Sequence, residues 1–203
     1  MKADTAFENM TMRVFLDRVA ADSPTLPAGG CAAALCSALA AALGGFVARI
    51  SGKKAVDPDE KTQIDAMVDT LRAIQEASLE AIGRDVDAYG KIMDAAKLPR
   101  GKERDKAMES ACITALGPPL KLVEYGVKML RAILSMWERI YPATRADAQV
   151  AAHLAYACLK SGLAIARANI DCIQDDTPAN SYRSTLESFQ AEGESLYESI
   201  RER

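Results

Sequence analysis

The chain has 203 residues and a formal net charge of −3, with 49% hydrophobic but only 5% aromatic residues. The charge comes without a basic block, so a nucleic-acid partner is not expected. A core of Ala, Leu, Ile, Val and Met suits closely packed helices, whereas strands favour the aromatic residues that are sparse here. The length fits one helical domain over residues 1–203.

The cysteines favour neither a metal site nor a disulfide framework. They show no CxxC spacing, their number is odd, and only one histidine, His153, could join them. They are expected to be small apolar fillers in a reducing cytoplasm. A cytoplasmic location also agrees with an N-terminus that lacks an apolar signal segment. The five are Cys31, Cys36, Cys112, Cys158 and Cys172.

The first predicted elements are a short amphipathic helix over 11–21, a loop of turn-forming residues over 22–30 and an Ala-rich helix over 31–50. This third element contains a single charge, Arg49, and is long enough to span a bilayer. Small residues on all its faces, including Gly44 and Gly45, instead favour a central helix surrounded by others. No membrane partner is therefore expected.

Helical periodicity continues through the rest of the chain. Asp57 reads as an N-cap, with Pro58 at the first helical position and Glu60 as the capping-box acid. Further helices are expected over 58–97, from about 103 to a break at 117–119, over 120–137, over 144–173 and after 178. The fold class predicted is all-α, an up-and-down bundle of five to six helices, several of them long. Such long helices favour a homodimer.

Two positions beside the Ala-rich helix are candidate ligand sites. Gly29 and Gly30 lie at its N-terminus, where unpaired amides and the helix dipole can bind an anionic or carbonyl-bearing ligand. The alternative is an ordinary entry loop. Lys53 and Lys54 follow the far end of the same helix, where they either bind a ligand carboxylate or complement the C-terminal dipole.

Asp147 has two interpretations. With Thr144 as N-cap, it is the acidic residue of a capping box three positions later. As a functional carboxylate it would lie at a helix start beside Tyr141 and Arg145 and handle a proton. His153 follows six residues later, about 240° around an ideal helix, so the two side chains do not share a face.

Several motifs together resemble a known family. Their types and their order along the chain are similar to those of the cyclodeaminase domain of formiminotransferase-cyclodeaminase and its free-standing relatives, which include methenyltetrahydrofolate cyclohydrolases. The motifs are Ser23-Pro24-Thr25, Pro27-Ala28-Gly29-Gly30, Gly52-Lys53-Lys54, Asp85-Val86-Asp87-Ala88-Tyr89, Leu98-Pro99, Pro118-Pro119-Leu120, Ala146-Asp147 and Asn169 with Asp175. Residues Ala28, Cys31, Ala55, Val56, Tyr141, Ala146 and Ile165 stand where the family usually has Gly, Ser, Lys, Tyr, Asn, Ser and Asn.

The resemblance implies hydrolysis of 5,10-methenyltetrahydrofolate to 10-formyltetrahydrofolate, without a metal or a tightly bound cofactor. Formiminotetrahydrofolate cyclodeaminase activity, which releases ammonia, and folate binding without turnover are the alternatives. The resemblance places the folate in a groove between helices, often at a subunit contact. It makes Asp147 the candidate catalytic residue. The candidate substrate-binding residues are Pro27, Gly29, Gly30, Lys53, Lys54, Asp85 and Asn169.

One distance constrains this site. Asp147 and Asn169 are 22 residues apart, about 33 Å along an unbroken helix. They can line one small site only if the helix bends, for which Ser161-Gly162 is the candidate position, or if two subunits contribute. We therefore hypothesise from the sequence that two subunits of a homodimer contribute Asp147 and Asn169 to one site.

Overall fold

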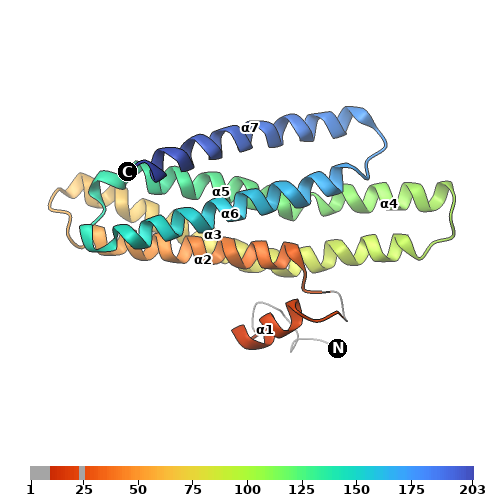
Figure 1. Cartoon of the computed structure of the whole chain (residues 1–203), viewed down its shortest axis with the longest axis horizontal. Helices are drawn as coiled ribbons and strands as arrows, with labels where there is room; N and C mark the ends of the chain where they lie inside the picture. The colour runs from red at the N-terminus through yellow and green to blue at the C-terminus, as the bar shows by residue number, and fades with distance from the viewer. Residues whose placement is uncertain (1–9, 23–25) are drawn as a thin grey trace.

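The structure, a computed structural model, describes residues 10–22 and 26–203, and this part of the chain contains helices and no strand (Figure 1). The all-α prediction is confirmed. The helices are α1 Met12–Val19, α2 Gly29–Gly52, α3 Pro58–Ala96, α4 Lys102–Ala115, α5 Gly117–Ser135, α6 Arg145–Ile170 and α7 Asp176–Arg201. Two single-turn 3-10 helices, η2 Trp137–Arg139 and η3 Pro142–Thr144, connect α5 to α6.

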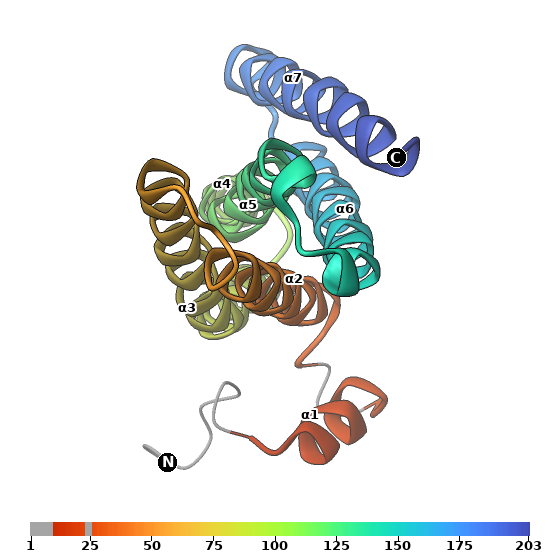
Figure 2. The same cartoon turned by 90° about the vertical axis from the view of Figure 1, so that its left-hand side faces the viewer.

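The bundle consists of α2 to α7, which run alternately in opposite directions, with α4 and α5 in line as one pair (Figure 1). Viewed along the bundle, α7 lies on the outer side of α5 and α6, and α1 lies beyond the opposite side, next to α2 (Figure 2). Phe15 is the buried residue of α1 and joins a cluster that includes Cys31 and Ile82. The up-and-down arrangement predicted from the helical periodicity is confirmed.

Helix α2 is the apolar centre of the bundle. It is long and apolar enough to cross a membrane, but 61% of its most apolar stretch is buried against other helices. Its buried side chains are almost all small, including Ala33, Ala40 and Ala48, so α3 and α6 can pack closely against it. This is the environment predicted for a central core helix.

The helix start predicted at Asp57 is confirmed, whereas α7 begins at Asp176, earlier than the predicted start after residue 178. Asp57 precedes α3 and its side chain accepts a hydrogen bond from the Asp59 amide at 2.9 Å. Asp175 does the same for α7 through the Thr177 amide, also at 2.9 Å. Both carboxylates satisfy amides that the first helical turn leaves unpaired, and both lie at the positive end of the helix dipole.

Helices α5 and α6 approach each other closely because glycines lie at their contact. A Cβ atom on Gly126 would come within 2.8 Å of the Leu159 Cβ and 3.0 Å of the Ala155 carbonyl oxygen. On α6, a Cβ on Gly162 would lie 3.0 Å from the Pro119 carbonyl oxygen. A larger side chain would force the helices apart. The start of α5 is consequently held against the middle of α6.

Candidate functional site

A cavity of about 400 Å³ lies at the N-terminal end of α2. It opens between α2, the second half of α3, the last residue of α4 and the last turns of α6. Its volume lies in the range of small-molecule sites, and most of its lining is apolar. Four predicted site residues line it together: Gly29, Gly30, Asp85 and Asn169.

The carboxylate of Asp85, on α3, lies at the N-terminus of α2, where a helix-capping side chain usually lies. The residue at the N-cap, Ala28, has no side chain that can bond the free amides of the first turn. The Cys31 thiol donates a hydrogen bond to Asp85 Oδ2 at 3.4 Å, and the Cys31 amide also bonds the carboxylate. A Cβ on Gly30 would overlap the Asp85 carboxylate. Gly30 is therefore needed for the approach of Asp85 to α2.

The environment of Asp85 raises the pKa of its carboxyl above the ordinary value. Burial is the main cause, because a carboxylate loses hydration in this cavity. The hydrogen bonds from the Cys31 thiol and amide favour the ionised form and oppose part of this effect. Burial also raises the pKa of the Cys31 thiol to about 12, so Cys31 remains a neutral donor.

Asn169 is oriented by a backbone carbonyl of α4. Its Nδ2 donates a hydrogen bond to the Ala115 oxygen at 2.9 Å. Because a carbonyl can only accept, this bond fixes which end of the amide faces Ala115. Asn169 Oδ1 remains as a hydrogen-bond acceptor on a residue that lines the cavity.

The other walls of the cavity are aromatic and aliphatic. Tyr89 and Ile92 follow Asp85 along α3, and Ile165 faces them from α6. Pro27 is buried between Leu26 and Ala28, both of which line the cavity. The walls are therefore mainly apolar, and the Asp85 carboxylate and the Asn169 amide are polar groups among them.

The structure does not bring Lys53 and Lys54 to this cavity. They follow α2 at its other end, about 36 Å away along a helix of 24 residues. Both are exposed, and the Lys54 ammonium lies 5.5 Å from the centre of the Tyr141 ring. Lys54, Tyr141 and Arg145 line a separate open hollow of about 470 Å³.

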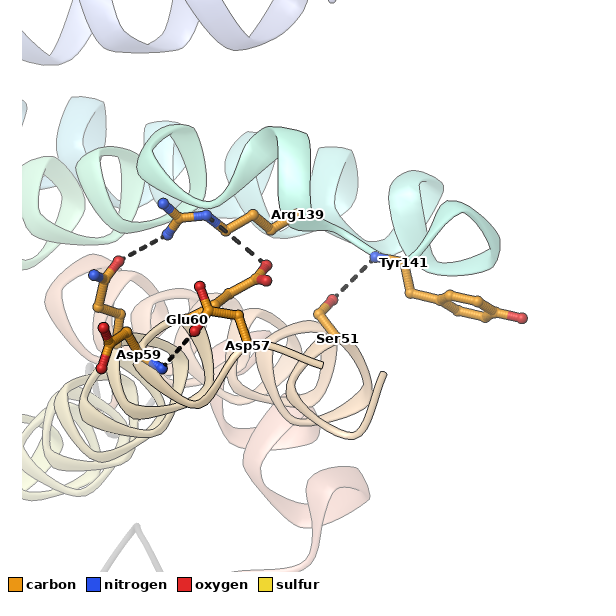
Figure 3. A network of polar contacts seen from close by, with 7 residues as sticks. Ser51, Asp57, Asp59, Glu60, Arg139 and Tyr141 are labelled. Carbon is orange, nitrogen blue, oxygen red and sulfur yellow. Dashed lines mark hydrogen bonds and ion pairs between the residues drawn. The ribbon is translucent and has the colours of Figure 1, made fainter. Parts of the chain in front are cut away.

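Polar contacts fix the shape of this second hollow (Figure 3). Ser51 Oγ accepts a hydrogen bond from the Tyr141 amide at 3.1 Å, and so joins α2 to the turn before α6. Arg139 reaches α3, where it lies 3.9 Å from Glu60 and donates to Gln63 at 2.9 Å. Glu60, predicted as a capping-box acid, is therefore engaged with η2.

Asp147 lies in the first turn of α6 and lines neither hollow. Helix α6 runs unbroken from Arg145 to Ile170, so Asp147 and Asn169 are separated by the expected distance of about 33 Å. Helix α6 has no break at Ser161-Gly162, the position considered for a bend, and the alternative that two subunits contribute stays a prediction.

The capping box, one of the two interpretations of Asp147, does not form. Thr144 precedes α6 but makes no side-chain cap bond, because its hydroxyl donates to the Tyr141 carbonyl at 3.0 Å. The 3-10 turn η3 places that carbonyl within reach. Asp147 remains close to the positive end of the α6 dipole.

Within residues 10–22 and 26–203, no group of three or more His, Cys, Asp or Glu side chains is placed to hold a metal ion. All five cysteines are free, and Cys31, Cys112 and Cys158 are buried as the predicted apolar fillers. Cys31 has the additional contact with Asp85 that the sequence did not predict.

Comparison with known proteins identifies the family and the fold of the chain. The sequence profile of formiminotransferase-cyclodeaminase matches residues 11–188. A methenyltetrahydrofolate cyclohydrolase from Methylorubrum extorquens is 29% identical over 96% of this chain and 95% of its own length. The crystal structure of a formiminotetrahydrofolate cyclodeaminase from Thermotoga maritima has the same fold, with a TM-score of 0.88, 22% identity and 96% of each chain covered. The chain belongs to the formiminotransferase-cyclodeaminase family.

Proposed function

We propose that this protein hydrolyses 5,10-methenyltetrahydrofolate to 10-formyltetrahydrofolate in the cavity at the N-terminus of α2. The observation that carries the proposal is a partly buried carboxylate, Asp85, in a mainly apolar cavity of about 400 Å³. The reacting carbon of the substrate belongs to a cation spread over N5 and N10. A carboxylate in a poorly hydrated site stabilises such a cation more strongly than it would in water.

Asp85 is proposed as the proton-handling group in place of Asp147, since Asp85 lines the cavity and Asp147 does not. Water adds its oxygen to the cationic carbon, and the ionised carboxylate accepts the proton that water loses. The bond between that carbon and N5 then breaks, N5 takes up a proton and the hydroxyl proton is released. The sum is one water consumed and one proton liberated, with the formyl group left on N10.

The rest of the cavity matches the pterin ring of the substrate. Its flat faces can pack against the walls formed by Tyr89, Ile92 and Ile165. The ring also carries N–H donors along one edge, and the oriented Oδ1 of Asn169 is an acceptor suited to that edge. A Cβ added to Gly29 would have no neighbouring atom within 4 Å, so there is free space beside Asp85.

We also propose that the protein acts as a cytoplasmic homodimer formed through α2 and α6. Large apolar side chains are exposed along these helices: Leu39 is 52% exposed, Phe46 40% and Val150 47%. An isologous pairing with the two α2 helices antiparallel would cover these side chains. It would also bring Lys53 and Lys54 of one subunit toward the Gly29 end of its partner, where they could bind the carboxylates of the folate tail.

The dimer is tested by Leu39→Glu, which places a charge in the proposed interface. Light scattering at micromolar concentration is expected to give a dimer mass for the parent and a monomer mass for the variant, with helix content unchanged. Ile113→Glu is the matched control, because Ile113 is also exposed, at 40%, but lies on α4. A monomeric parent, or a Leu39→Glu variant that remains dimeric, would contradict this interface.

The activity is tested with purified protein and two substrates. Loss of the methenyl absorbance, with 10-formyltetrahydrofolate recovered by chromatography, is the expected result. Ammonia released from formiminotetrahydrofolate would instead support cyclodeaminase activity, the activity named for the Thermotoga maritima protein. Tight folate binding without turnover of either substrate would show a binding protein and contradict the enzymatic proposal.

A further inference from the structure

The junction of α4 and α5 lacks two helical hydrogen bonds. Leu116, which connects α4 to α5, has helical φ and ψ angles of −71° and −25°, so α5 continues nearly along the path of α4. An amide at position 119 would then be directed at the Ala115 carbonyl, four residues earlier. Residues 118 and 119 are both proline and have no amide hydrogen to donate.

A side chain from a distant part of the chain supplies the donor that Pro119 lacks. Asn169 Nδ2 bonds the Ala115 oxygen at 2.9 Å across a sequence separation of 54 residues. The contact is possible because Gly162 lets the start of α5 lie close to α6, with the Pro119 carbonyl 3.0 Å from a Cβ position on Gly162. Ala115 is buried, so its carbonyl needs a donor from within the protein.

We propose that Pro119 is a positioning residue for the ligand cavity and acts through Ala115 and Asn169. By leaving the Ala115 carbonyl without a helical donor, Pro119 keeps the Asn169 amide in one orientation. Asn169 Oδ1 is then presented to the cavity as an acceptor for an N–H edge of the bound ring. The identity of that ring rests on the proposed function, whereas the orientation of the Asn169 amide does not.

Restoring an amide at position 119 should release Asn169. In Pro119→Ala the new N–H can bond the Ala115 carbonyl locally, without ordering a side chain from another helix. The Asn169 amide would no longer be held, and its Nδ2 group could turn toward the cavity. A donor on the protein would then face donors on the ligand, so binding should weaken.

The test compares Pro119→Ala and Pro119→Val with Pro118→Ala. Both substitutions at 119 restore the amide, and valine retains more of the volume of the buried proline. Pro118→Ala also restores one amide, but four residues after Thr114, whereas the Asn169 amide bonds the carbonyl of Ala115. KM for methenyltetrahydrofolate should rise about three- to tenfold in both variants at 119, the effect of one neutral hydrogen bond. It should be unchanged in Pro118→Ala, and kcat should fall less than KM rises.

A second readout needs no substrate. In ¹⁵N-labelled protein, the Asn169 side-chain amide signals, identified by their absence in Asn169→Ala, should be protected from solvent exchange in the parent and in Pro118→Ala. They should lose that protection in both variants at 119. Retained protection would overturn the proposal, as would equal KM values for the variants at 118 and 119. Loss of protection in a protein that turns over no folate would uphold the positioning role and reject only the proposed function.

Discussion

Asp85→Asn is expected to lower the turnover of methenyltetrahydrofolate about 10²–10⁴-fold, the usual contribution of a positioned proton acceptor. Asparagine has nearly the shape of aspartate and can still accept a hydrogen bond from the Cys31 thiol. It cannot accept and return a proton, and it carries no charge to stabilise the cationic substrate. Steady-state rates and folate affinity, measured on one preparation, separate the loss of chemistry from the loss of binding.

Asp147→Asn is the control for this experiment, because Asp147 is a helical carboxylate outside the cavity. Its turnover should stay within about threefold of the parent, with a stability change of about 0.5–1 kcal/mol from the weakened dipole interaction. The opposite pattern, a large loss at Asp147 and none at Asp85, would contradict the proposed role of Asp85.

The pH dependence of the parent supplies a further check on Asp85. The group must be ionised to accept a proton, and burial raises its pKa above the ordinary value. The value of kcat/KM should therefore fall as the pH decreases through this raised pKa. The fall should begin at a higher pH than an exposed aspartate would give, and Asp85→Asn should abolish this limb of the profile.

Gly30→Ala is expected to reduce turnover about 100-fold while leaving the fold intact. The added Cβ would overlap the Asp85 carboxylate, which lies at the end of a flexible side chain and can turn away. The carboxylate would then leave the cavity, while the packing of the helices remains. Circular dichroism should show unchanged helix content, and the melting temperature should fall only slightly.

Gly90→Ala provides the comparison for Gly30→Ala. Gly90 is also helical, but no atom lies within 4 Å of its Cβ position, and it does not line the cavity. Alanine there should raise the stability by about 1 kcal/mol, because it favours the helix, and leave turnover unchanged. Full activity in Gly30→Ala would show that the position of Asp85 at α2 is not required.

Features that depend on neighbouring residues could be predicted from the sequence. Asp57 bonds an amide two residues away, so the cap of α3 could be predicted from a short segment. The cap that Asp175 forms on α7 has the same local spacing, although the sequence analysis placed the start of that helix too late. The alanine-rich composition of α2 likewise indicated a central helix. Thr144 shows the limit of this reasoning, since a preceding 3-10 turn offered its hydroxyl a carbonyl in place of an amide.

The cavity could be predicted only in part. Gly30 was a candidate because of its place at a helix start, whereas Asp85 and Asn169 were identified through a family resemblance. Periodicity does not show that residues 54 positions apart will meet. Neither the Cys31 bond to Asp85 nor the role of the Ala115 carbonyl followed from the sequence pattern. Pro119, four residues after Ala115, was the one local signal of a free carbonyl.

The overlap between a Cβ at position 30 and the carboxylate of Asp85 also limits how this family can diverge. A side chain gained at position 30 would displace the acid at position 85 from the cavity, so a lineage that uses the acid there must keep the glycine. The two positions should therefore change together among relatives, although they are far apart in the chain. A relative with a bulky residue at the first position and an acid at the second would hold that acid outside the cavity or have a differently placed α3.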